Sequence, residues 1–303
     1  MLEMGIEEPE RMRRSKLKSN WFRILLVVYF ILSLFIFWRW TAFRRTLPTL
    51  EVVYTYHHVP LTLFHGYSAY IHYNLFWKFR IKKTVYVKKE YKESEARLLR
   101  WSFDNVKYLD NVGREGGTYL HHIVHNWEDL ADKTLFLQAH SQWHEMTHGR
   151  LRYIDSSTGF LSLGPYVLSQ CGESWPGSYA QMKSIWSLFH GEPCPENEHQ
   201  LSTWSGQFVV SRQRIRHNHY KNYVEMLHLM TAPSDHPIYD ESPDDWTPPR
   251  DPINPYLGHS LERSWPIIFN CNQPTFAIDT THCGGEVLPG SPDCQCFDSK
   301  NLD

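Results

Sequence analysis

The residues that could carry chemistry are concentrated in one segment, NVGREGGTYLHHIVHNWEDLADKTLFLQAHSQWH, which runs from Asn111 to His144. It opens with a glycine-rich turn containing Arg114 and Glu115, continues as a helix with one apolar face, and ends in an apolar strand. An arginine beside a helix N-terminus can hold a diphosphate through a bidentate contact that the helix dipole reinforces. The alternative is a local ion pair between Arg114 and Glu115.

Polar side chains follow the apolar strand, where Gln138, His140 and His144 would emerge at its carboxyl end. In a parallel sheet this end faces the ligand. His140 and His144 are therefore candidate metal ligands. His148 continues the spacing of four, which on a helix would place three imidazoles on one face. Because His140 belongs to the strand end, the spacing of four does not place it on one helical face with the other two histidines. A metal-dependent oxidase using all three is kept as an alternative.

Motifs and charge exclude several other functions. The chain contains no Gly-x-Ser-x-Gly, phosphate-binding loop or GxGxxG pattern, so serine-hydrolase, NTPase and dinucleotide-binding interpretations lack their motifs. Its 31 basic residues balance 33 acidic ones, which argues against a nucleic-acid partner.

The elements that must position these residues alternate along the chain. We expect strands at 51–56, 84–88 and 134–138, and helices at 66–79 and 118–127. This alternation predicts an α/β domain of three layers, with a mostly parallel, Rossmann-like sheet covered by helices on both faces. Farther along we expect a strand at 207–210, a helix at 212–230 capped by Ser211, a surface loop at 232–256, and a helix at 257–269 that Pro266 would shorten.

An apolar segment precedes this domain. Residues 24–38 carry no charge, and Trp21 to Trp40 matches the length of a membrane-spanning helix with tryptophans at both interfaces. The heavier basic flank lies before the segment, so we expect a cytoplasmic N-terminus and a lumenal (endoplasmic reticulum or Golgi) or extracellular C-terminal part, a type II arrangement. A cleaved signal peptide is the alternative. The predicted organisation is a tail at 1–20, the membrane anchor at 21–40, a stem at 41–50, the α/β domain at 51–275 and a cysteine-containing tail at 276–303.

All six cysteines follow the anchor, as disulfides in an oxidising compartment would require. Six cysteines allow 15 pairings, which the sequence leaves open. A zinc site built from Cys283, Cys294, Cys296 and His282 is the alternative, although its spacing matches no standard finger.

Five ordered blocks resemble a known family. They are Asn111–Glu115 (N-x-G-R-E), Thr118–Val124 (TYLHHIV), Phe136–His140 followed by Trp143 and His144, Gly206–Ile215 (GQFVVSRQRI) and Gly258–Phe269 (GHSLERSWPIIF). Together they resemble a family of fungal single-pass membrane proteins labelled a domain of unknown function, over about residues 51 to 271. The family usually has a histidine where this chain has Pro266, and an acidic residue where it has His57 and His58.

The layout of that family is similar in turn to GT-A glycosyltransferases, which have a nucleotide-binding βαβ half, an acidic metal motif after an apolar strand, and an acceptor half. The resemblance implies that the donor or its phosphates would be bound by Asn111, Arg114, Glu115, Gln138, Gln207 and Arg212. Gln138 and His140 stand where the acidic motif would be, which puts a Mn²⁺-dependent reaction in doubt.

Glu262 is the expected general base of an inverting transfer, because it is the one carboxylate of the LERSW block. A structural ion pair with Arg263 or Arg212 is the alternative. Trp143, Trp204 and Trp265 could stack on sugars or belong to the core.

The functional hypothesis is a membrane protein, anchored in lipid through residues 21–40, that transfers a sugar from a nucleotide sugar to a glycan or small-molecule acceptor. Its cofactor is unknown. The alternative is a non-catalytic binding or accessory protein, of the secretory pathway or of secondary metabolism, that keeps the fold without the metal motif.

Overall fold

The chain folds as two compact units, Met1–Leu47 and Pro48–Asp303. The computed structural model describes residues 7–90, 92–141, 143–174, 177–240, 251–284 and 290–298. Part of the predicted surface loop (241–250) and parts of the predicted C-terminal tail (285–289 and 299–303) lie outside these ranges.

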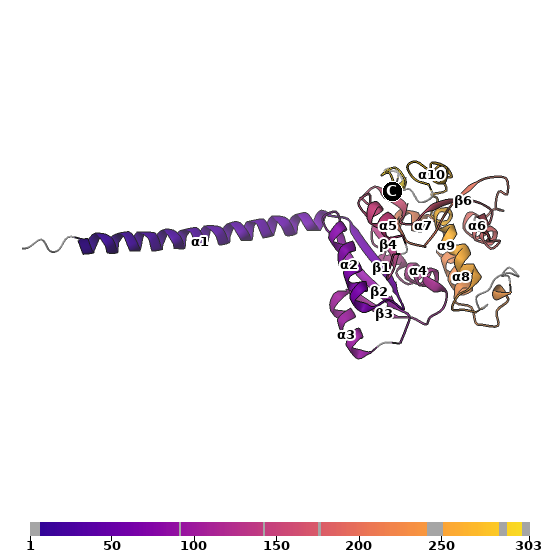
Figure 1. Cartoon of the computed structure of the whole chain (residues 1–303), viewed down its shortest axis with the longest axis horizontal. Helices are drawn as coiled ribbons and strands as arrows, with labels where there is room; N and C mark the ends of the chain where they lie inside the picture. Colours follow the sequence, from indigo (N-terminus) through magenta and orange to yellow (C-terminus); the bar gives the residue numbers. More distant parts are fainter. Residues whose placement is uncertain are drawn as a thin grey trace, which may run out of the picture. The chain divides into compact units, whose positions relative to one another are not determined.

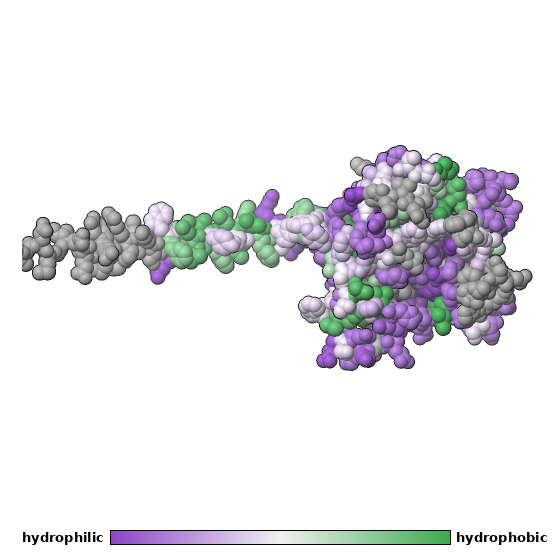
Figure 2. Space-filling view, in the orientation of Figure 1, coloured by the Kyte–Doolittle hydropathy of each residue, from purple (hydrophilic) through white to green (hydrophobic). Residues whose placement is uncertain are grey.

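The first unit is the helix α1 (Glu7–Thr46). Its segment Trp21–Thr46 is long and apolar enough to cross a membrane, and none of its most apolar window is buried in the protein. Figure 2 shows these side chains as a hydrophobic stretch of the helix. The helix runs through the residues predicted as tail and stem, up to Thr46, whose Oγ1 donates to the carbonyl of Phe43 at 2.8 Å. Pro48 then disfavours helical geometry at Leu47, which separates the anchor from the first strand.

The second unit is an α/β domain built on a mixed, mostly parallel sheet of seven strands in the order β11-β5-β10-β4-β1-β2-β3. Figure 1 labels β4, β1, β2 and β3 of this sheet. The strands β1, β2, β3 and β4 are parallel, whereas β10 is antiparallel to both of its neighbours and β11 is antiparallel to β5. A second sheet has the order β8-β7-β6-β9. The strands are β1 (Thr49–Tyr56), β2 (Arg80–Val87), β3 (Asn105–Tyr108), β4 (Lys133–Gln138), β5 (Thr158–Ser162), β6 (Tyr166–Gln170), β7 (Glu173–Ser174), β8 (Gly177–Ser178), β9 (Gln200–Thr203), β10 (Phe208–Ser211) and β11 (Cys296–Phe297).

Helices cover both faces of the large sheet, as the alternation of apolar segments predicts. One face packs against α2 (Leu61–Leu75), α3 (Glu93–Ser102) and α5 (His144–Leu151). The other packs against α4 (Arg114–His125), α6 (Met182–His190), α8 (Tyr220–Met230) and α9 (Tyr256–Ile268). The remaining helices are α7 (Arg212–His217), α10 (Thr275–Ile278) and the short 3-10 turns Trp127–Asp129 and Pro237–Tyr239.

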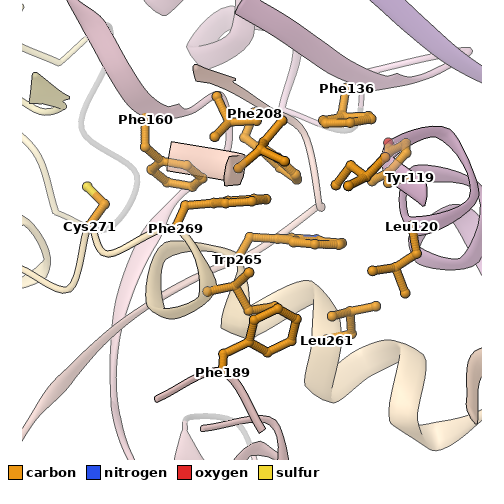
Figure 3. Close-up of a cluster of buried hydrophobic side chains, with 14 of the residues drawn as sticks. Tyr119, Leu120, Phe136, Phe160, Phe189, Phe208, Leu261, Trp265, Phe269 and Cys271 are labelled. Atoms are coloured by element: carbon orange, nitrogen blue, oxygen red, sulfur yellow. The ribbon is translucent and has the colours of Figure 1, made fainter. Parts of the chain in front are cut away.

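An aromatic cluster fills the second of these layers (Figure 3). Trp265 has no exposed surface, its ring lies 5.0 Å from that of Phe208, and it stacks on Phe269 at 5.7 Å. Trp265 therefore belongs to the core. Trp143 and Trp204 stack on each other at 6.2 Å and are partly buried.

Two helical predictions differ from the structure for identifiable reasons. Ser211 caps a helix by accepting from the Arg214 amide, but the predicted helix 212–230 is interrupted at Asn218, which is extended and donates its side-chain amide to the Ile268 carbonyl at 2.7 Å. Conversely, α9 continues through Pro266 to Ile268. The proline lies in the last turn, where its missing N–H removes only one helical hydrogen bond.

All six cysteines form disulfides, and the pairs are Cys171–Cys194, Cys271–Cys296 and Cys283–Cys294. The zinc alternative for the last three cysteines is therefore wrong, because their thiols are consumed in two of these bonds. Cys271–Cys296 ties the end of α9 to the edge strand β11.

Candidate functional site

A cavity of about 290 Å³ opens where β1 and β4 end. From β1 the chain moves outward on one side to β2 and β3 and then crosses back to β4 on the other side, so the connections diverge at this point. Ligands of open α/β sheets bind at such a switch point, beyond the carboxyl ends of the strands. The cavity is lined by Thr55, His57, His58, Val59, Lys88, Asn111, Arg114, Glu115, Gln138, Ala139, His140 and Ile253.

Five of the residues predicted from sequence meet in this cavity: Asn111, Arg114, Glu115, Gln138 and His140. Parallel register explains the meeting, because Thr55 of β1 lies beside Gln138 of β4. Asn111 approaches from the loop after β3, and its side chain lies 3.2 Å from the His57 ring. The Gln138 Oε1 is buried and has no hydrogen-bond partner among the residues that the structure describes, so an acceptor is left for a ligand donor.

The turn before α4 places Arg114 and Glu115. Gly113 has a φ of 68°, and a Cβ there would lie 2.7 Å from the Met230 carbonyl, which explains the glycine. Arg114 follows with a φ of 49°, a conformation that is rare for a residue with a side chain. Its backbone carbonyl is held by Lys88, and its side chain turns toward α9.

Arg114 is fully engaged by protein groups. Its guanidinium lies 2.6 Å from the His259 ring, 3.3 Å from Glu262 and 3.6 Å from Glu115. Burial, together with the charge of Arg114, lowers the pKa of His259 to about 3, so this imidazole is neutral and can accept from the guanidinium. The ion-pair alternative for Arg114 and Glu115 is thus the arrangement seen, with Glu262 as a second carboxylate.

Glu262, whose side chain is 12% exposed, lies beside the cavity and does not line it. One carboxylate oxygen accepts from the Ser205 amide at 2.6 Å and the other from Arg114. Burial, and then the negative charge of Glu115, raise its pKa, whereas the two arginines Arg114 and Arg263 oppose that rise. Glu262 is thus held by Ser205 and Arg114, and Glu115 is the carboxylate that lines the cavity.

The structure also brings in a residue that the sequence analysis did not select. Lys88 follows β2 directly, is only 3% exposed, and donates to the carbonyls of Val112 and Arg114 at 2.5 and 2.6 Å. Burial lowers the pKa of its ammonium group to about 8, against the opposing charge of Glu115. The position of Lys88 at the end of a predicted parallel strand is the sequence signal that could have identified it as a site residue.

Besides Glu262, three further predicted residues lie away from the cavity lining. Gln207 is buried next to Gly206, and its side-chain oxygen accepts from the Tyr67 hydroxyl at 3.3 Å. Arg212 follows the C-terminus of β10, the antiparallel strand, and pairs with Asp132 at the opposite end of the sheet. His144 and His148 are the two histidines of a His-Glu-x-x-His sequence on α5, and their ring centroids lie 3.8 Å apart with the planes tilted by 53°.

The divalent ion implied by the GT-A resemblance does not fit this cavity. Glu115 is the one acidic residue among the described residues that line it, and a hard divalent ion prefers several oxygen ligands. Within the described ranges, no group of three or more His, Cys, Asp or Glu residues could hold a metal ion, and this includes the histidines at 140, 144 and 148.

No protein-family model matches this chain, and no curated protein matches it in sequence. What the cavity binds therefore has to follow from its lining residues and their charges.

Proposed function

We propose that the protein is a membrane-anchored glycosyltransferase that binds a nucleotide sugar in the cavity between the ends of β1 and β4. The observation that carries the proposal is the convergence of a buried cation, Lys88, and a carboxylate, Glu115, on one cavity at the switch point. The parallel order β3-β2-β1-β4 supports the resemblance to the nucleotide-binding half of GT-A enzymes and, with it, to the fungal family.

The lining residues suit a transfer to an acceptor hydroxyl. Glu115 takes the proton of the hydroxyl as its oxygen attacks the anomeric carbon, and the bond from that carbon to the diphosphate breaks. Negative charge develops on the leaving diphosphate, where the Lys88 ammonium and the N-terminus of α4 stabilise it. Glu262 acts through Arg114, whose guanidinium it shares with Glu115.

The proposal includes a type II orientation with the α/β domain in the secretory lumen or outside the cell. Three disulfides in the second unit and the basic flank before the apolar segment support it. The chain has no N-x-S/T sequon, so one engineered at the exposed Glu128 turn should be glycosylated in microsomes. An unmodified site there, with modification of one placed before residue 20, would show the reverse orientation.

Catalysis is tested with the purified full chain in detergent. At least one nucleotide sugar of a panel should raise the melting temperature and yield a product on a glycan array. The Glu115→Gln variant should keep donor binding and lose turnover, whereas Glu128→Gln, at a carboxylate that is 86% exposed, should behave as the unmodified protein. Absence of any donor-induced shift, with and without Mn²⁺, would contradict the proposal.

A non-catalytic binding protein is the second candidate. It is favoured by Gln138 and His140 at the position of the acidic motif, and by the engagement of Glu262 with Arg114 and Ser205. Such a protein would bind a donor in the same cavity without forming product, and Glu115→Gln would leave its cellular phenotype unchanged.

A further inference from the structure

The cavity contains a buried positive charge, that of Lys88, which forms no ion pair with any residue that the structure describes. Lys88 is 3% exposed, and its two printed hydrogen bonds go to neutral carbonyl oxygens. Among the described residues no carboxylate forms an ion pair with it, although Glu115 acts on it at longer range. Buried cations in proteins are normally paired, because desolvation of an isolated charge is strongly unfavourable.

The neighbouring charges do not supply the missing partner. The positive charges of Arg114 and Arg263 are balanced by two carboxylates, those of Glu115 and Glu262. Lys88 is the charge left over in this group. An ammonium group has three donors, and two of them hold the 112–114 turn, so one remains for a ligand.

The surroundings of Lys88 select the ligand chemistry. The first turn of α4 faces the same cavity, and its N-terminus has no side-chain cap, so its dipole and amides favour an anion. Asn111 adds an amide, and His57, His58 and His140 add imidazoles that can donate hydrogen bonds. A volume of about 290 Å³ is at the lower end of small-molecule sites and accommodates the diphosphate and one adjoining group of the donor.

We infer that Lys88 and the N-terminus of α4 bind the diphosphate of a nucleoside diphosphate directly, in the role that a divalent cation has in metal-dependent GT-A enzymes. The inference rests on the proposed function and specifies how the donor is held. Lys88 provides the positive charge, and the bound diphosphate provides the counter-ion that the buried ammonium lacks.

The test uses the full chain in detergent and measures the affinity for UDP and GDP by calorimetry, in EDTA and in Mn²⁺. At least one of the two should bind in EDTA, with little change on addition of Mn²⁺. Lys88→Met should weaken binding about ten- to hundredfold, as expected for loss of a charged hydrogen bond. Lys89→Met is the matched control, because Lys89 is adjacent in sequence, lies outside the cavity lining and should change affinity less than about threefold.

The outcomes separate the two proposals. Binding that requires Mn²⁺ would overturn the role of Lys88 while leaving the glycosyltransferase proposal intact, and so would a Lys88→Met variant with unchanged affinity. Failure of both nucleotides and of all nucleotide sugars to bind, with or without Mn²⁺, would overturn the proposed function itself. The comparison of EDTA with Mn²⁺ needs no variant, so it decides the matter even if Lys88→Met does not fold.

Discussion

Raising the pH from 7 to 9 should weaken nucleotide binding through a single group, Lys88. Burial lowers the pKa of its ammonium group to about 8. About nine-tenths of the molecules then carry the charge at pH 7 and about one-tenth at pH 9, so the apparent Kd should increase about tenfold. Between these values the binding-competent form is the protonated one, and affinity is lost as the pH rises.

The stability of the free protein should change in the opposite direction. Since the folded-state pKa of Lys88 lies below its unfolded value of 10.5, the unfolded chain holds more protons between about pH 8 and 10.5. Lys88 therefore destabilises the free protein below pH 8, and this penalty disappears as the pH rises to 10.5. A depression of about 2.5 pH units corresponds to about 3 kcal/mol.

Both trends are measured against the Lys88→Met variant. Glu115, Arg114 and the cavity histidines also face Lys88, and the variant retains them, so the difference between the two pH profiles isolates the lysine. Calorimetry gives the affinity for the tightest-binding nucleotide, and urea unfolding gives the stability. Superimposable pH profiles of affinity for the two proteins, or a wild-type affinity that increases with pH, would refute the reasoning.

Four further predictions concern the fold. Cys171→Ser opens a disulfide that spans 23 residues and should lower the free energy of unfolding by about 3 kcal/mol, measured by urea denaturation. Gly116→Ala should destabilise by about 1–3 kcal/mol, because its Cβ would meet an α9 side chain at 2.9 Å; Gly66→Ala in α2, with open space around it, should stabilise by about 0.5–1 kcal/mol in the same assay. Burial lowers the pKa of His122 to about 3, so stability should fall as the pH drops below 6.5, and His122→Gln should reduce that loss in urea titrations.

The front half of the fold follows from local sequence pattern. The strands predicted at 51–56 and 134–138 lie within β1 and β4, and the one predicted at 84–88 overlaps β2, which begins earlier, at Arg80, and ends at Val87. Their β-branched and aromatic runs leave a strong signal. The helix predicted at 118–127 is extended to Arg114 in the structure. A glycine-rich turn does not show where a helix begins, since Gly116 and Gly117 are poor helix formers that are tolerated here by close packing.

The second half depends on contacts that sequence does not display. The interruption at Asn218 depends on an acceptor fifty residues away, the Ile268 carbonyl. The strands β5 and β9 are short, and their pairing partners, β10 and β6, are distant in sequence. Disulfide pairing likewise depends on which cysteines the fold brings together, because the sequence around each cysteine does not distinguish among the 15 possible pairings.

The candidate site, too, is predictable from the sequence only in part. Asn111, Arg114, Glu115, Gln138 and His140 meet because each lies at or after the carboxyl end of a strand of the parallel set, which sequence order and the switch-point rule predict. Arg114 lies in the cavity where the sequence places it, but its guanidinium contacts protein side chains. These are the carboxylates of Glu115 and Glu262 and the imidazole of His259. A charged residue can be assigned to a site from its place in the sequence, but its partner depends on tertiary structure.

Charge pairing also distinguishes the two ends of the sheet. At the amino-terminal ends of the parallel strands a larger cavity, about 720 Å³, contains Arg212 with Asp132 and Lys133 with Asp298 at 2.8 Å, so its cations are paired. At the carboxyl end the smaller cavity contains Lys88, which has no carboxylate partner among the described residues. Volume alone would favour the first cavity. Since a paired cation gains little from an added anion, whereas a buried unpaired one gains a counter-ion, an anionic ligand should bind at the second.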